Sequence, residues 1–79
     1  MGTRGRVRSW SDEEGRGVVD SVQTPGGCWV HYSAVDVPGF ASLEPGQDVV
    51  LEWELARQDG FGFRALAVRP VGSKGLSAS

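Results

Sequence analysis

The fold class is decided by residues 47–59, QDVVLEWELARQD, which form a stretch without glycine or proline that is long enough for a helix of three turns. Every second residue from Val49 to Leu55 is nevertheless apolar, and Val50 or an acidic residue stands next to each. Alternation with period two in β-branched and aromatic residues is typical of a strand with one apolar face and one wet face. The stretch therefore predicts a strand, with Trp53 continuing its core face.

The other segments indicate further short strands. Twelve glycines and four prolines interrupt the sequence, so no other stretch favours a long helix. We expect strands over residues 4–11, 16–22, 28–33 and 61–70. We expect turns or loops at residues 12–15, at Thr24-Pro25-Gly26-Gly27, at residues 37–46 and at residues 58–60.

Five short strands in so short a chain favour a closed sheet, because closure removes the unpaired edges of an open one. The predicted fold is all-β: a five-stranded antiparallel barrel of the oligonucleotide/oligosaccharide-binding type. Residues 1–71 would form one domain. The small and polar residues 72–79 are expected to be a disordered tail.

Length and composition exclude several classes of protein. A chain of 79 residues buries only roughly 60% of its unfolded surface, which leaves little room for a core and a deep catalytic cleft. Cys28 and His31 are the only residues of their types, too few for a disulfide or for a zinc site of about four ligands. We expect no metal, cofactor, small-molecule substrate or enzymatic activity.

The cellular location is predicted from the segments that the sequence lacks. No run of about 18 apolar residues would cross a membrane, and the first residues lack the apolar stretch of a signal peptide. A single cysteine fits a reducing compartment. The sequence thus predicts a cytoplasmic protein without a membrane partner.

The charge balance limits the possible partners. The formal net charge is −2 and the pI is about 5.2, which argues against a strongly basic protein that coats duplex DNA. A local basic patch remains possible, because charge distribution matters more than the sum. Most of the cationic residues are arginines, whose planar groups stack on bases as well as carrying charge.

Large side chains are predicted on an outer face. In residues 28–33, Cys28, Val30 and Tyr32 alternate with Trp29 and His31. The core needs apolar residues, so Cys28 and Val30 should point inward. Trp29 and His31 should then point outward.

The same alternation in residues 4–11 places Arg6, Arg8 and Trp10 on one face. Aromatic rings beside arginines suit single-stranded nucleic acid, because bases stack on rings at about 1–3 kcal/mol each and cations hold phosphates. Pattern alone leaves Trp10 and Trp29 with two equal alternatives, structural packing in the core or at its rim, or a role in stacking on bases. His31 alone could be an ordinary surface histidine, and Cys28 a small buried residue.

From about Gly5 to Pro70 the sequence resembles the bacterial cold-shock domain family. The family's motifs G-x-V-K-W-F-N and K-G-F-G-F-I correspond to residues 5–11 and 14–19, and its V-F-V-H-F followed by S-A-I corresponds to residues 28–35. Its loop G-F-x-x-L-x-x-G-Q corresponds to residues 39–47, and its closing A-x-x-V to residues 65–68. The second motif and the loop are the specific part.

The resemblance implies a five-stranded antiparallel barrel that binds single-stranded RNA or DNA, often as an RNA chaperone or a regulator of transcription or translation. By position, it implies that Arg8 stands where the family has a binding lysine. It also implies stacking positions at Trp10, Trp29, His31 and Phe40, with Tyr32 at the rim.

Departures from the family pattern lie mostly in the first motif. Ser9 replaces an exposed tryptophan, Arg16 and Val18 replace two phenylalanines, and Glu14 replaces a lysine. Phe63 stands where the family usually has proline. We expect Arg16 and Val18 still to line the interface, with Arg16 stacking through its guanidinium.

The sequence as a whole predicts a monomeric module that binds single strands of about 4–8 nucleotides. Phosphate contacts are expected from Arg6, Arg8, Arg16 and Arg64. The alternative is a barrel of the same fold reused to bind a protein. The altered first motif and the acidic pI favour that alternative, and the retained Trp29, His31 and Tyr32 oppose it.

Overall fold

The computed structural model describes residues 2–37, 42–58 and 60–71. Phe40 and the expected tail at residues 72–79 lie outside this part of the chain. The strands are β1 (Thr3–Ser11), β2 (Arg16–Ser21), β3 (Thr24–His31), β4 (Asp48–Gln58) and β5 (Phe61–Pro70), and a short 3₁₀ helix, η1, spans Tyr32–Ala34. Within the described ranges no helix is long and apolar enough to cross a membrane.

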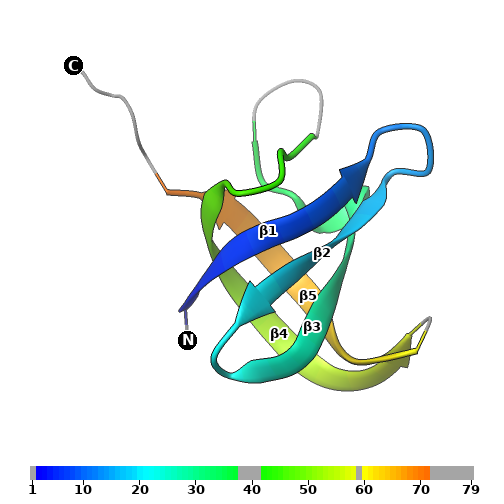
Figure 1. Cartoon of the computed structure of the whole chain (residues 1–79), viewed down its shortest axis with the longest axis vertical. Helices are drawn as coiled ribbons and strands as arrows, with labels where there is room; N and C mark the ends of the chain where they lie inside the picture. The colour runs from blue at the N-terminus through cyan, green and yellow to red at the C-terminus, as the bar shows by residue number, and fades with distance from the viewer. Residues whose placement is uncertain (1, 38–41, 59, 72–79) are drawn as a thin grey trace.

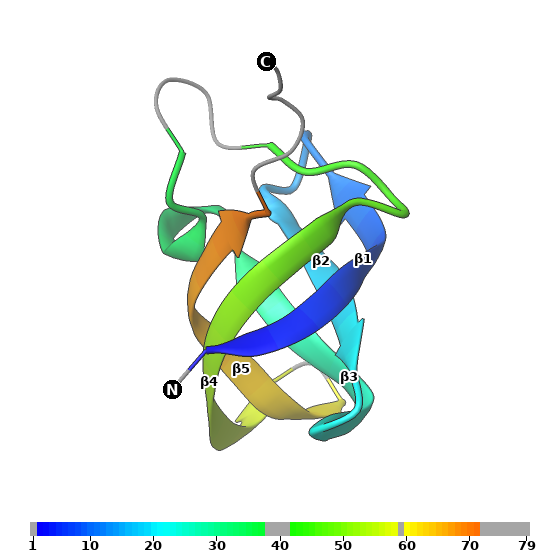
Figure 2. The ribbon, with the colours of Figure 1, turned by 90° about the vertical axis from the view of Figure 1, so that its left-hand side faces the viewer.

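The strands close into a barrel in the order β1-β2-β3-β5-β4 (Figure 1). This confirms the predicted all-β five-stranded barrel. The pairings are antiparallel except for a short parallel contact between β3 and β5. Seen from the side, β1 lies across β4, and η1 lies beside the end of β5 (Figure 2). There Asp36 donates its backbone N–H to the carbonyl of Val68 at 2.8 Å.

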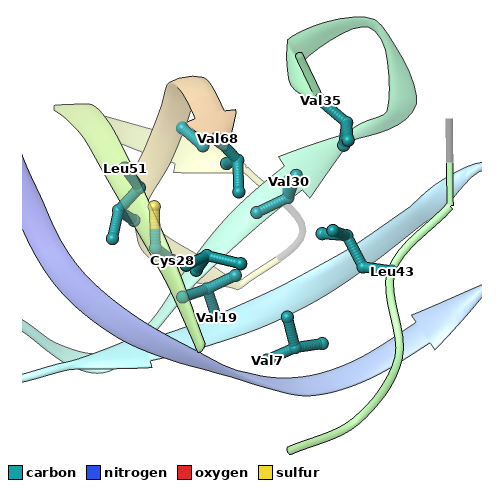
Figure 3. Close-up of a cluster of buried hydrophobic side chains, with 10 residues drawn as sticks. Val7, Val19, Cys28, Val30, Val35, Leu43, Leu51 and Val68 are labelled. Atoms are coloured by element: carbon teal, nitrogen blue, oxygen red, sulfur yellow. The ribbon is translucent and has the colours of Figure 1, made fainter. Parts of the chain in front are cut away.

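The barrel core is built mainly from β-branched and leucine side chains of all five strands (Figure 3). Cys28 and Val30 are fully buried in it, as predicted. Burial raises the pKa of the Cys28 thiol to about 11, so the thiol stays protonated at neutral pH. Cys28 therefore acts as a small buried apolar residue.

The turn between β2 and β3 is not where the sequence predicted it. Thr24-Pro25-Gly26-Gly27 begins β3, and the turn lies at residues 22–23. The Thr24 side chain is fully buried, and its hydroxyl lies 2.6 Å from that of Ser21. This bond closes the hairpin around residues 22–23, before the glycines at which the sequence predicted the turn.

The predicted third strand also ends early. It was expected to reach Ser33, but β3 stops at His31 and the chain turns into η1. The Nδ1 atom of His31 caps this helix by accepting from the backbone N–H of Ser33. Tyr32 therefore leaves the inward face that it was predicted to share with Cys28, and is 52% exposed.

A bulge in β1 overturns the predicted common face of Arg6, Arg8 and Trp10. Val7 pairs with Val19 but Ser9 pairs with Val18, so Arg8 is an extra residue in β1. Beyond the bulge the alternation is reversed. Ser9 points outward, and the Trp10 ring packs against the core.

Gly17, the register partner of Trp10, makes room for this ring. A Cβ atom on Gly17 would collide with the backbone oxygen of Ser9 and lie 2.6 Å from Cε3 of Trp10. The indole can therefore pack against the core because β2 carries no side chain there.

The apolar face predicted for residues 49–55 is correct only in its first half. Val49 and Leu51 are fully buried. Trp53 packs against the core and meets Phe63 edge-to-face, with ring centroids 5.3 Å apart. Leu55 is 76% exposed, because β1 pairs with β4 only up to Leu51 and the core does not reach the β4–β5 turn.

Candidate nucleic-acid interface

One row of outward side chains runs across all five strands. Trp29 is its centre, since it alternates with the buried residues Cys28 and Val30 on β3. Register pairs connect it on both sides, giving the order Ser9, Val18, Trp29, Arg64 and Glu54. The row follows the curved outer surface of the closed barrel, with the Trp29 indole at its middle.

A second row brings further predicted residues beside the first. Arg16 pairs in register with His31, two residues along β3 from Trp29. The Trp29 and His31 rings are stacked, with centroids 5.8 Å apart and planes 21° apart. The Tyr32 ring follows, 4.4 Å from His31 and tilted by 39°. We call these three residues, Trp29, His31 and Tyr32, the ring cluster.

The His31 ring is held by its helix-capping contacts. Its Nδ1 atom accepts from the Ser33 backbone N–H at 3.3 Å and lies 2.8 Å from the Ser33 hydroxyl. In the neutral ring this acceptor role leaves the proton on Nε2. The ring cluster thus keeps a fixed histidine orientation, with Nε2 as the donor of the neutral ring.

Phe61 joins this face, although the predicted site did not include it. A Cβ atom on Gly27 would lie 2.8 Å from Val18 Cγ1, 3.0 Å from Arg8 Nη2 and 3.2 Å from Phe61 Cε1. The three side chains meet over Gly27 because it has no side chain of its own. In the sequence Phe61 is an aromatic residue at the start of the predicted last strand. Only the closure of the barrel places it near Val18 on β2.

Each of the four predicted phosphate-binding arginines is ion-paired. Arg8 Nε donates to Asp20 at 3.0 Å, and Nη2 donates to the carbonyl of Gly26. The other pairs are Arg6 with Asp48 at 3.2 Å, Arg16 with Glu14 at 2.9 Å, and Arg64 with Glu54. Exposed ion pairs contribute only about 0–1 kcal/mol, so a phosphate can compete for such an arginine.

The Arg8–Asp20 pair gives a testable pH effect. The hydrogen bond from Arg8 lowers the pKa of the Asp20 carboxyl, and the same contact raises the pKa of Arg8. A lowered folded-state pKa stabilises the fold above the unfolded value of about 3.9, and this stabilisation is lost as pH falls through the folded pKa. In Arg8→Gln we expect the pKa of Asp20 to rise toward its ordinary value, measured by carboxyl NMR titration.

The control for this titration is Arg6→Gln, which removes an arginine that is paired with Asp48 instead. The pKa of Asp20 should change much less in this variant. An unchanged Asp20 pKa in Arg8→Gln would show that the pair is not formed in solution.

The structure thus brings together most of the predicted site. The residues on the common face are Val18, Trp29, His31, Tyr32, Arg8, Arg16 and Arg64. Arg6 lies apart, between Asp20 and Asp48 on the side where β1 meets β4. Among the described residues, no group of three or more His, Cys, Asp or Glu is placed to hold a metal ion.

Trp10 is also separate from the ring cluster. Its Nε1 donates to Asp12 Oδ1 at 2.8 Å, and the Ser42 hydroxyl donates to the same oxygen at 2.7 Å. Asp12, predicted as part of a solvated turn, therefore links the β1–β2 turn to the segment before β4.

No protein-family model matches the chain. The chain is 33% identical to the cold shock-like protein of Aquifex aeolicus over 72 residues, which are 91% of this chain and 99% of that protein. It is 39% identical to the major cold shock protein CspA of Bacillus anthracis over 54 residues, 68% of this chain and 79% of the relative.

A third relative is the cold shock protein CspB of Geobacillus stearothermophilus. It is 39% identical over 49 residues, 62% of this chain and 73% of its own length. The aligned identity and the five-stranded barrel agree with the motifs in the sequence. The chain belongs to the bacterial cold-shock domain family.

Proposed function

We propose that this protein binds single-stranded RNA or DNA on the face that carries the ring cluster. The observation that carries the proposal is the stacked pair of Trp29 and His31, which lies on the outside of β3 directly over the buried Cys28 and Val30. Large aromatic rings on an outer face leave apolar surface exposed to water, which is unfavourable. Stacking on bases would cover that surface. In the cell the protein would act in the cytoplasm as an RNA chaperone or a regulator of transcription or translation.

Each residue of the face would have a distinct role. Trp29 and His31 would stack on successive bases, with Tyr32 at the rim. Neighbouring positions along a strand that share a face are about 6.6 Å apart, and neighbouring strands about 4.8 Å, spacings that suit splayed bases. Val18 and Phe61 would cover the apolar parts of the bases.

The arginines nearest the rings would hold phosphates. Arg16 and Arg64 pair in register with His31 and Trp29, and Arg8 reaches over Gly27 beside Val18 and Phe61. Arg6 would contact only a strand that extends toward β1 and β4. Trp10 would contribute to the barrel core rather than to base stacking, because its ring packs against the core.

The proposal is tested by fluorescence anisotropy with labelled oligonucleotides of about seven bases, single-stranded and duplex. We expect micromolar binding of the single strand and weaker binding of the duplex. Three arginine–phosphate contacts predict that log K falls with log salt at a slope of about −2, from about −0.7 per contact. No anisotropy change at about 100 μM protein and low salt would overturn the proposal, since such binding would be weaker than about 5.5 kcal/mol.

A second candidate function is protein binding on the same barrel. It is favoured by the ion pairing of Arg6, Arg8, Arg16 and Arg64, which reduces their attraction for phosphate. NMR shift mapping separates the two functions. Chemical-shift changes centred on Trp29 when an oligonucleotide is added support single-strand binding. Chemical-shift changes elsewhere when a partner protein is added, without a response to nucleic acid, support protein binding.

A further inference from the structure

Both aromatic positions of β3 have an arginine–glutamate couple beside them. Arg64 on β5 pairs in register with Trp29, and its own register partner on β4 is Glu54, with which it forms an ion pair. The row therefore reads ring, arginine, glutamate.

The same order is repeated around the other ring. Arg16 on β2 pairs in register with His31, and its Nε donates to Glu14 Oε1 at 2.9 Å. Glu14 belongs to the turn that leads into β2, and Gly15 beside it accepts a hydrogen bond from the backbone N–H of Tyr32 at 2.8 Å. The turn and its carboxylate are thus fixed to the ring cluster.

Both couples are open to a ligand. The side chains of Arg64 and Glu54 are 44% and 38% exposed, and those of Arg16 and Glu14 are 42% and 58% exposed. A carboxylate has about four acceptor sites, more than its arginine uses. Each couple therefore presents carboxylate oxygens next to guanidinium N–H groups, and the arginine of each couple lies one strand away from a ring.

Carboxylates cannot hold phosphates, because both are anionic, but they accept hydrogen bonds from bases. Guanine carries an acceptor, O6, followed by two donors, N1–H and the N2 amino group. An arginine–glutamate couple offers the matching order of donor, acceptor and acceptor. Cytosine and adenine each carry only one donor group on this edge.

Thymine and uracil fit the couple worst. Their single N–H lies between two carbonyl oxygens. When one carbonyl accepts from the arginine and the N–H donates to the carboxylate, the other carbonyl faces a carboxylate oxygen, and the lone pairs of the two oxygens repel each other. A buried or stacked polar group without a partner costs affinity. The couples would therefore discriminate against thymine and uracil as well as favouring guanine.

We infer that the Arg64–Glu54 and Arg16–Glu14 couples read the edges of bases stacked on Trp29 and His31, and that the protein prefers guanine-containing single strands to strands of thymine or uracil alone. The inference rests on the proposed single-strand binding. It adds the two glutamates, which no phosphate contact would use, as specificity-determining residues. Each arginine has five N–H donors, so Arg16 and Arg64 would donate to a base edge as well as to a phosphate.

The first test compares three labelled DNA strands of about seven bases: all thymine, alternating thymine and guanine, and alternating thymine and inosine. Inosine lacks only the N2 amino group of guanine. We expect the guanine strand to bind at least about fivefold more tightly than the thymine strand. The inosine strand should lose most of this advantage.

The second test uses Glu54→Gln and Glu14→Gln, which keep the side-chain shape and remove the charge. Each should reduce the preference for guanine while all-thymine affinity is kept or raised. Asp48→Asn is the matched control, because it removes the same charge from the Arg6–Asp48 pair, away from β3. Its preference should equal that of the unaltered protein, and equal unfolding midpoints would confirm that all variants are folded.

The outcomes separate the two proposals. Equal affinity of the unaltered protein for the thymine and guanine strands would overturn base reading and leave single-strand binding intact. A full guanine preference in both glutamine variants would overturn the assignment to these glutamates. Absence of binding to every strand would overturn both the inference and the proposed function.

Discussion

Truncation of Leu51 to alanine is expected to lower the free energy of unfolding by about 2–5 kcal/mol. Leu51 is fully buried in the first half of β4, where it pairs in register with Thr3 on β1 and Val68 on β5. Its removal leaves a cavity that strands on both sides would have to fill. A domain of this length has only about 4–12 kcal/mol of stability in total, so a large part of the protein would be unfolded under mild denaturation.

The matched control lies four residues further along the same strand. Leu55→Ala removes the same atoms from a side chain that is 76% exposed, and should change stability by less than about 0.5 kcal/mol. Urea unfolding followed by far-UV circular dichroism measures both variants. A loss in Leu55→Ala as large as that in Leu51→Ala would mean that the core extends to Leu55, as alternation in the sequence predicted, and would contradict the exposure of this side chain.

Local alternation explains what the sequence could predict. Cys28 and Val30 are inward and Trp29 and His31 outward because side chains in a strand point to opposite faces in turn. The all-β class followed from the same rule applied to Val49 and Leu51. These features depend only on near neighbours in the chain. The barrel closure was predicted from the number of short strands, and the motif similarity implied the same fold.

Other features depend on contacts between distant segments, and the sequence did not reveal them. The bulge at Arg8 exists because β1 must pair with β2 at one end and β4 at the other. Leu55 is exposed because the pairing of β1 with β4 ends at Leu51. The arginine pairs with Asp48, Asp20 and Glu54 span 42, 12 and 10 residues of sequence, so charge counting alone predicted a freer set of cations.

Replacing Trp29 with alanine is expected to weaken single-strand binding by about 5- to 150-fold, the equivalent of about 1–3 kcal/mol for one lost stacking contact. The loss should be as large for thymine strands as for other sequences, because every base has a face that can stack. Trp29→Phe keeps a ring and should retain most of the affinity. Anisotropy titration of the same labelled strand measures both variants.

Trp10→Phe is the second control, and it separates two placements of the interface. The Trp10 ring packs against the core beyond the β1 bulge, so its reduction to phenylalanine should leave affinity nearly unchanged. If affinity instead fell with Trp10→Phe and persisted in Trp29→Ala, bases would stack on β1. That result would favour the unbroken alternation of Arg6, Arg8 and Trp10 over the bulged strand. Retained binding in Trp10→Phe and its loss in Trp29→Ala would centre recognition on β3, where the stacked rings lie.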